Sequence, residues 1–304
     1  MRQSRCSVYA VLICAVCLAG ILPLGCPSPK GESNVTVLLA GDAGLTAAKT
    51  RLDLESVASL TVTVTEIALD YCPAAEGEGE GEGEGEGEGE GEGECEECEE
   101  CACAGETERI VVFTGEKEVD LRDLSGISEV ISAAELPAGS YCKIRLSIET
   151  PRLVLVLADG LGTVLENVQL TANGRLFVSG GFELPEGESS LVLLDFESFH
   201  LVQAGNSGKY VLTPQLRATI QVQSAEAQAT GAIVAVDPAT SMLTLDIDDS
   251  DATIDVNFAA ADILLADLTP GTPADLTLGA NIQVTGTLSV SGVLTADTIT
   301  LIAP

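Results

Sequence analysis

The stretch Leu60–Asp70, which reads LTVTVTEIALD, decides the fold class of this chain. Apolar residues occupy every second position in its first half and again near its end, but the two runs are out of phase. Alternation with a period of two is typical of a β-strand that buries one face. Because a slip of one residue would turn every later side chain to the wrong face, we predict a β-bulge near Thr65.

Alternating apolar residues recur in the rest of the chain. The segments CKIRLSI (142–148) and QLRATIQV (215–222) have the same period, and LVLLDF (191–196) is apolar on both faces, which predicts a central strand. Turn-forming residues separate the runs at Pro137-Ala138-Gly139, Asn173-Gly174, Pro185-Glu186-Gly187 and Asn206-Ser207-Gly208. Many short strands without helical periodicity predict an all-β protein that contains a β-sandwich.

The chain divides into two predicted domains at a short polar, alanine-rich break, Ser224–Ala229. Residues 34–223 are long enough for a complete β-sandwich. Residues 230–302 form a string of short hairpins, so we expect a small β-barrel-like domain there.

Four segments of the first domain carry a family resemblance: VTVLLAGDAG (35–44), LTVTVTEIALD (60–70), ELPAGSYCKIRLSI (135–148) and LLDFESFHLVQAGNSGKYVLTPQLRATI (193–220). Together they resemble an uncharacterised bacterial lipoprotein domain, domain-of-unknown-function family 4382. The segment LPAGSY (136–141) is also similar to the turn and strand of immunoglobulin-like and transthyretin-like sandwiches.

The second domain resembles another uncharacterised family, number 5666, through GAIVAVD (231–237) and LGANIQVTGTLSVSGVLTADTITL (278–301). Both resemblances imply β-rich modules of the cell envelope without known catalytic residues. We therefore predict a structural or binding module that is not an enzyme and needs no cofactor. An envelope protein or a glycan is the expected partner.

In the first family, only a modest turn separates the strands that correspond to Leu60–Asp70 and Arg109–Phe113. The resemblance therefore implies that residues 74–107 are an insertion within the sandwich and not a linker between domains. Glycine and glutamate alternate over much of this insertion. Such a sequence cannot bury apolar surface and repels itself, so we expect it to be extended and disordered.

Four cysteines follow the glycine–glutamate repeat, at Cys95, Cys98, Cys101 and Cys103. Thiolates at similar spacings hold zinc or iron–sulfur clusters, which makes a metal-binding envelope factor the alternative function. The last gap is a single residue, and an exported protein meets an oxidising space. We therefore favour disulfides or free thiols and predict no metal site.

Two more cysteines, Cys72 and Cys142, each follow a tyrosine on a predicted strand. This placement predicts a disulfide between them, and pairing with a cysteine of the insertion is the rival.

The N-terminus has the pattern of an export signal. Arginines precede an apolar run, 8–24, that is too short and too early for an ordinary membrane-spanning helix. The run ends in Gly25-Cys26, which resembles the lipobox of bacterial lipoproteins, although Pro23 stands where that motif usually has leucine.

We therefore expect residues 1–25 to be a lipoprotein signal peptide and Cys26 to carry the lipid. A simple anchor and a conventionally cleaved peptide are the alternatives. The resemblance implies a protein held on a membrane of the cell envelope by its lipid, facing the periplasm or the cell exterior.

The charge distribution narrows the choice of partners. The formal net charge is −33, and residues 76–100 contain fourteen glutamates and no basic residue. Nucleic acid is a polyanion that needs lysine and arginine side chains to displace its counterions, so we expect no nucleic-acid partner. The acidic stretch indicates weak binding of divalent cations or of a partner.

Two further candidates receive structural roles. The segment DIDDSD (246–251) lacks the glycine and the later glutamate of a calcium loop and falls where a hairpin turn is due. His200 has acidic neighbours but no serine or cysteine nucleophile motif near it, so we expect a structural histidine.

Overall fold

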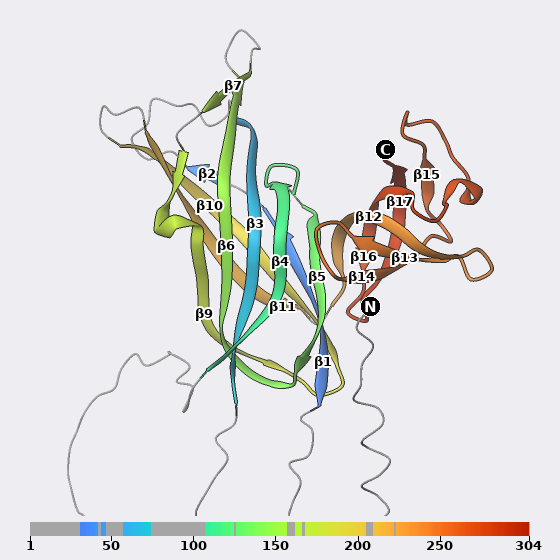
Figure 1. The fold of residues 1–304 in the computed structure, drawn as a ribbon, viewed down its shortest axis with the longest axis horizontal. Helices are drawn as coiled ribbons and strands as arrows, with labels where there is room; N and C mark the ends of the chain where they lie inside the picture. Colours follow the sequence, from blue (N-terminus) through green and yellow to red (C-terminus); the bar gives the residue numbers. More distant parts are fainter. Residues whose placement is uncertain are drawn as a thin grey trace, which may run out of the picture. The chain divides into compact units, whose positions relative to one another are not determined.

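The computed structural model describes residues 31–41, 44–46, 57–73, 107–124, 126–156, 162–165, 168–204, 209–221 and 223–303. Regular structure in these residues consists of β-strands and two short 3₁₀ helices, η2 (Thr171–Gly174) and η3 (Pro273–Asp275) (Figure 1). The predicted all-β class is confirmed. Within the described ranges, no helix has the length and apolarity needed to cross a membrane.

The smaller of two sheets has the strand order β4–β3–β6–β7, and β9 also pairs with β6. All of these pairs are antiparallel. The strands are β3 (Val57–Cys72), β4 (Glu108–Asp120), β6 (Gly139–Val156), β7 (Gly162–Leu165) and β9 (Arg175–Leu184).

The larger sheet has the order β13–β14–β17–β16–β12–β5–β1–β10–β11–β8, with β2 beside β10 and β15 beside β17. Its N-terminal strands are β1 (Glu32–Ala40), β2 (Gly44–Thr46), β5 (Ser128–Pro137), β8 (Val168–Leu170), β10 (Ser189–Gln203) and β11 (Tyr210–Gln221). Its C-terminal strands are β12 (Ala225–Asp237), β13 (Met242–Ile247), β14 (Thr253–Asn257), β15 (Asp262–Leu264), β16 (Asn281–Leu288) and β17 (Val293–Leu301).

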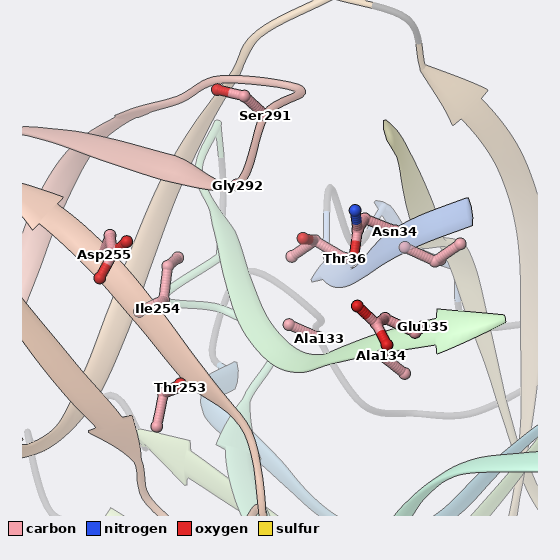
Figure 2. Close-up of a pocket in the computed structure, with 11 residues that line it drawn as sticks. Asn34, Thr36, Ala133, Ala134, Glu135, Thr253, Ile254, Asp255, Ser291 and Gly292 are labelled. Carbon is pink, nitrogen blue, oxygen red and sulfur yellow. The ribbon is translucent and has the colours of Figure 1, made fainter. Parts of the chain in front are cut away.

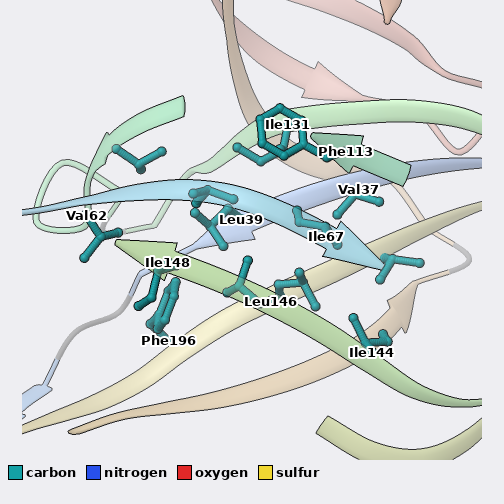
Figure 3. Close-up of a cluster of buried hydrophobic side chains, with 14 of the residues drawn as sticks. Val37, Leu39, Val62, Ile67, Phe113, Ile131, Ile144, Leu146, Ile148 and Phe196 are labelled. Carbon is teal, nitrogen blue, oxygen red and sulfur yellow. The ribbon is translucent and has the colours of Figure 1, made fainter. Parts of the chain in front are cut away.

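The smaller sheet packs face to face on the N-terminal strands of the larger sheet over an apolar core (Figure 3). Val62 and Ile67 of β3 and Leu146 of β6 belong to the same cluster as Leu39 of β1 and Phe196 of β10. All five side chains have 0% exposure. The predicted β-sandwich is therefore present, and burial of these side chains stabilises it by roughly 25 cal/mol per Å² of apolar surface.

The long strand β3 keeps one face on this core despite the slip in its sequence pattern. Thr65 has no partner in either ladder, because the register shifts between Val64 and Glu66 against both β4 and β6. Val64 before the shift and Ile67 after it are fully buried. The predicted β-bulge at Thr65 is confirmed, and its extra residue returns the apolar side chains to the core.

Strands β1 and β10 are buried on both faces. Val37 and Val192 belong to the sandwich core, whereas Leu38 and Leu191 belong to a second cluster that includes the C-terminal strands. Strand β10 also lies between β1 and β11 in the sheet. The prediction that residues 191–196 form a central strand is confirmed, and burial on both faces explains their nearly continuous apolar sequence.

The C-terminal strands close into a ring. Strand β12 pairs with β13 and β16, β17 pairs with β16 and β14, and β14 pairs with β13. Five strands thus form a closed cycle, the small barrel-like unit that the hairpin pattern predicts.

The predicted break at Ser224–Ala229 is wrong for residues 225–229. These residues begin β12 and pair with Val284–Leu288 of β16. Ala227 and Ala229 have 0% exposure, so the alternating alanines form the buried face of a strand and do not mark a linker.

A buried ion pair lies where β4, β5 and β12 meet. Lys117 Nζ of β4 is 3.3 Å from Glu129 Oε1 of β5, and both side chains are almost completely buried. Gln228 of β12 is opposite Glu129 in a parallel ladder and hydrogen-bonds its carboxylate. Burial raises the pKa of Glu129, although Lys117 acts in the opposite direction. Because a buried charge without a partner is costly, this network disfavours other registers between β5 and β12 and other placements of β4 against them.

The acidic segment joins two neighbouring strands. Tyr71 at the end of β3 is directly opposite Glu108 at the start of β4. Residues 74–107 therefore connect the two strands of one antiparallel hairpin, although residues 74–106 themselves lie outside the described ranges.

Three of the predicted turns, at 137–139, 173–174 and 185–187, lie between strands as expected. Gly174 and Gly187 have φ values of 74° and 72°, in the left-handed region that glycine adopts without steric cost. The predicted turn at 206–208 lies outside the described residues.

Two C-terminal fragments test the corrected start of β12. A fragment from Ser224 to Pro304 keeps the whole strand, whereas a fragment from Thr230 leaves Val284–Leu288 without its partner. We expect the shorter fragment to be less stable by roughly 3 kcal/mol, because each ladder hydrogen bond contributes about 1 kcal/mol. The melting temperature should fall by about 10 °C or more. Thermal circular dichroism measures the difference, and equal melting temperatures would contradict the role of residues 225–229.

Candidate functional site

An open groove crosses the outer face of the smaller sheet. On β6, Ile144, Leu146 and Ile148 face the core, so Arg145 and Ser147 between them face outward. The groove has a volume of about 550 Å³, within the usual range of ligand sites. We call it the outer groove; its polar and aromatic lining residues are Thr65, Glu66, Arg109, Arg145, Ser147, Glu149, Asn173, Arg175 and Phe177.

Strand pairing places these side chains in rows across the sheet. Glu66 of β3 is opposite Ser147 of β6, which is opposite Arg175 of β9. In the next row, Arg145 is opposite Phe177. Residues directly opposite each other on one face have Cβ atoms about 5 Å apart, so each row forms a continuous surface.

The central cation of the outer groove, Arg145, is fixed by a buried carboxylate. Arg145 Nε donates to Asp70 Oδ1 at 2.9 Å and Oδ2 at 3.0 Å, and Nη2 donates to Oδ2 at 2.6 Å. The Asp70 side chain is only 5% exposed, whereas that of Arg145 is 41% exposed. Hydrogen bonding to Asp70 raises the pKa of Arg145 above its ordinary value. The guanidinium is therefore held in one orientation with part of its surface open to solvent.

The other two arginines of the groove differ in their contacts. Arg109 donates to Glu66 in a partly exposed ion pair. The Arg175 side chain makes no hydrogen bond or ion pair within the described part of the chain, whereas its backbone N–H donates to the carbonyl oxygen of Ala172. The guanidinium of Arg175 thus retains its donors for a ligand or for water.

An exposed aromatic ring completes the outer groove. Phe177 is 63% exposed, so its ring is open to solvent beside the arginines. Lys143 Nζ lies 5.2 Å from the centre of its ring, in cation–π geometry. The outer groove thus combines an aromatic surface with cationic and hydroxyl-bearing side chains.

The outer face of the smaller sheet carries basic side chains, whereas the chain as a whole is strongly acidic. Arg109, Lys143, Arg145 and Arg175 lie on one sheet of a protein with a formal net charge of −33. The sequence contains no lysine or arginine after Arg217. The barrel-like unit is therefore purely acidic, and the smaller sheet has a more balanced charge.

The predicted Cys72–Cys142 disulfide is wrong. Cys142 has a free thiol, and Cys72 is disulfide-bonded. Cys142 has no partner in either ladder of β6: Tyr141 and Lys143 pair with the consecutive residues Tyr71 and Asp70 of β3, and the register with β9 shifts from Phe182 to Ser179 at the same point. This bulge places Cys142 Sγ 3.7 Å from the carbonyl oxygen of Asp70, whereas Cys72 is opposite Ser140. The rival prediction, a bond to a cysteine of the insertion, stays a prediction.

Several other predicted site residues lie outside the described residues. They are the lipidation site Cys26 and the alternative metal ligands Cys95, Cys98, Cys101 and Cys103. Within the ranges that the structure describes, no three His, Cys, Asp or Glu side chains are grouped to hold a metal ion.

The acidic segment 246–251 and His200, for which we expect structural roles, lie at a strand connection and in a strand. Residues 248–251 form the connection between β13 and β14, as predicted for the acidic segment. His200 lies in β10 opposite Thr213 and Thr46.

A second cavity, of about 330 Å³, lies between β1, β5 and β14 (Figure 2). Its polar lining consists of short side chains and two carboxylates: Asn34, Thr36, Glu135, Thr253, Asp255 and Ser291. Asp255 already accepts a hydrogen bond from Thr244 at 3.0 Å. This cavity contains neither a cation nor an aromatic ring, so the outer groove is the stronger candidate.

The family comparison decides the classification of the chain. The model described as "Domain of unknown function (DUF4382)" matches residues 48–214, more than half of the 304 residues. The chain belongs to this family. The match covers β3 to β10 and most of the outer groove's supporting sheet, so this sheet is part of the family domain. Comparisons with curated proteins and with solved structures give no match.

Sequence reasoning missed the outer groove. The signal was present in Lys143, Arg145, Arg175 and Phe177, which alternate with buried residues on their strands. The pattern does not show that β6 pairs with β9. This pairing brings Lys143 and Arg145 of β6 beside Arg175 and Phe177 of β9.

Two matched substitutions compare the stability contributed by the partly buried Arg145–Asp70 pair with that of the more exposed Arg109–Glu66 pair. Asp70→Asn should lower the free energy of unfolding by about 2 kcal/mol, because it weakens hydrogen bonds to a buried carboxylate. Glu66→Gln removes a partly exposed ion pair on the same face and should cost less than about 1 kcal/mol. Urea denaturation measures both values. Equal losses would show that the burial of Asp70 does not strengthen its pair.

Proposed function

We propose that this protein is a lipid-anchored protein of the bacterial cell envelope whose β-sandwich is a non-catalytic binding module. The observation that carries the proposal is the outer groove, an open site of ligand size with one arginine held in a fixed orientation. A preset charged group lowers the entropy cost of binding because it does not have to be ordered by the ligand.

The anchor is supported by the sequence that precedes the fold. Cys26 follows an apolar run and a glycine, and β1 begins only six residues later, at Glu32 (32 − 26 = 6). Six residues of extended chain span at most about 20 Å. A lipid on Cys26 would therefore hold the sandwich close to the membrane.

The start of β1, which follows the predicted anchor in the chain, and the root of the acidic insertion lie at one end of the sandwich. The amide of Ala138 donates to the carbonyl oxygen of Gly31, and the hydroxyl of Tyr71 donates to that of Ala138. The N-terminal end of β1 and the end of β3 are therefore at the same end of the sandwich.

The binding role, in preference to catalysis, is supported by how the carboxylates are used. Asp70 and Glu66 each accept hydrogen bonds from an arginine. Such pairs orient the cations for binding and leave these carboxylates poorly placed to transfer protons. The resemblance of the C-terminal part to family 5666 supports a second accessory module.

Replacement of the lipidated residue tests the anchor. Cys26→Ser should leave the precursor unprocessed or release the protein from the membrane fraction, because no thiol remains to carry the lipid. Fractionation with radiolabelled palmitate detects the change, and Cys142→Ser serves as the control that keeps both label and location. A Cys26→Ser chain that is still processed and labelled would contradict the proposal.

Binding by the outer groove is tested with the unlipidated Cys26→Ser chain and isolated envelope fragments. We expect the chain to sediment with the fragments and to be retained less when Arg175→Gln and Phe177→Ala are added. The matched control, Arg122→Gln, alters an exposed arginine outside the groove and should change nothing. If the groove variants are retained as well as the parent chain, the groove is not the binding site.

A further inference from the structure

We infer that the outer groove binds an acidic polysaccharide, with sugar rings on Phe177 and uronic-acid carboxylates on Arg175 and Arg145. This inference rests on the proposed binding function and names its ligand class. It depends on three properties of the groove: donors for carboxylates, an exposed aromatic ring, and polar side chains between them.

The arginines select for a carboxylate. Arg175 offers a guanidinium without a partner among the described residues, and Arg145 binds Asp70 through Nε and Nη2, which leaves Nη1 outside these bonds. A guanidinium forms paired hydrogen bonds with a carboxylate, and such charge-assisted bonds are about twice as strong as neutral ones. Arg145 and Arg175 lie on adjacent strands in neighbouring rows, so carboxylates on successive units of one chain can reach both.

The exposed ring selects for a sugar. One face of Phe177 has Lys143 above it, at 5.2 Å from the ring centre. An aromatic face carries partial negative charge, and the C–H groups on one side of a sugar ring carry partial positive charge. A pyranose can therefore stack on the remaining face of Phe177 while its carboxylate reaches a neighbouring arginine.

The remaining polar residues match the hydroxyl groups of a sugar. Ser147 and Asn173 supply both donors and acceptors, and Glu66 and Glu149 supply acceptors. A small inorganic anion would make no use of Phe177 and would offer no hydroxyl donors to the two glutamates. A sugar with both hydroxyl and carboxylate groups satisfies both kinds of side chain.

The shape of the site indicates a polymer. The row Glu66–Ser147–Arg175 crosses three strands, which corresponds to two inter-strand spacings of about 4.8 Å. The groove is open to solvent and is not a closed pocket, so it does not limit its ligand to a single sugar unit.

Titration calorimetry on the detergent-solubilised full-length protein tests the ligand class. The probe is a short oligomer of galacturonic acid, and its fully methyl-esterified form is the control because it keeps the sugar chain but lacks the negative charge. Inorganic phosphate and a neutral glucose oligomer are the other probes. We expect binding of the acid oligomer, at least tenfold weaker binding of the ester, and no measurable binding of phosphate or of the neutral oligomer.

Variants connect the binding to named residues. Arg175→Gln and Phe177→Ala should each weaken binding of the acid oligomer about tenfold or more, whereas Arg122→Gln should leave it unchanged. A thermal melt of each variant shows that the fold is retained; Arg175→Lys, which keeps the charge but not the planar fork, should bind at an intermediate level.

The outcomes separate this inference from the proposed function. If the ester binds as tightly as the acid, or phosphate binds as tightly as the oligomer, the acidic-polysaccharide assignment is wrong. If no oligomer binds but the groove variants still lose retention on envelope fragments, the binding function stands and the ligand class is wrong. If neither assay responds to the groove variants, both are wrong.

Discussion

The strands β1 and β10 are buried on both faces, and the rest of the structure depends on this constraint. One face packs on the smaller sheet through residues such as Val37 and Val192, and the other contributes Leu38 and Leu191 to the cluster of the C-terminal strands. Each fully buried valine or leucine contributes roughly 1.5–3 kcal/mol. Removing either covering layer would expose a continuous apolar surface, so the sandwich and the C-terminal strands stabilise each other through the same pair of strands.

The smaller sheet uses only one of its faces for packing, and this asymmetry creates the candidate site. Its inner face is mostly apolar, with the buried Lys117 as a charged member, while its outer face carries arginines, carboxylates and an exposed phenylalanine. Two bulges shape this face: Thr65 on β3 lines the groove, and Cys142 on β6 lies beside the backbone of Asp70, the residue that holds Arg145. In an ordinary sheet such irregular pairing would weaken the ladder. In this sheet it positions polar side chains of the groove.

Acidic and basic residues are distributed unevenly along the chain, and the fold places them in different parts of the molecule. The glutamate repeat enters and leaves the sandwich between Tyr71 and Glu108, at the end where β1 begins. Two arginines of the groove lie next to this end, because Arg109 follows Glu108 on β4 and Arg145 binds Asp70, the neighbour of Tyr71. The basic side chains of the smaller sheet thus lie apart from the barrel-like unit, in which no lysine or arginine follows Arg217.

The sequence by itself determined the class, the bulge at Thr65, the central position of residues 191–196 and the turns, because each depends on the local alternation of apolar residues. The family resemblance of the first domain was likewise readable from its motifs, and the match over residues 48–214 confirms it. Only the tertiary structure decided that Cys142 stays free, that β12 begins at Ala225 and that Arg145, Arg175 and Phe177 form one site. These features depend on which strands are neighbours and in what register, and pairs such as β6 with β9 are separated by tens of residues in the chain. Local alternation fixes which face a side chain occupies, but the neighbour across the sheet is set by packing of the whole core.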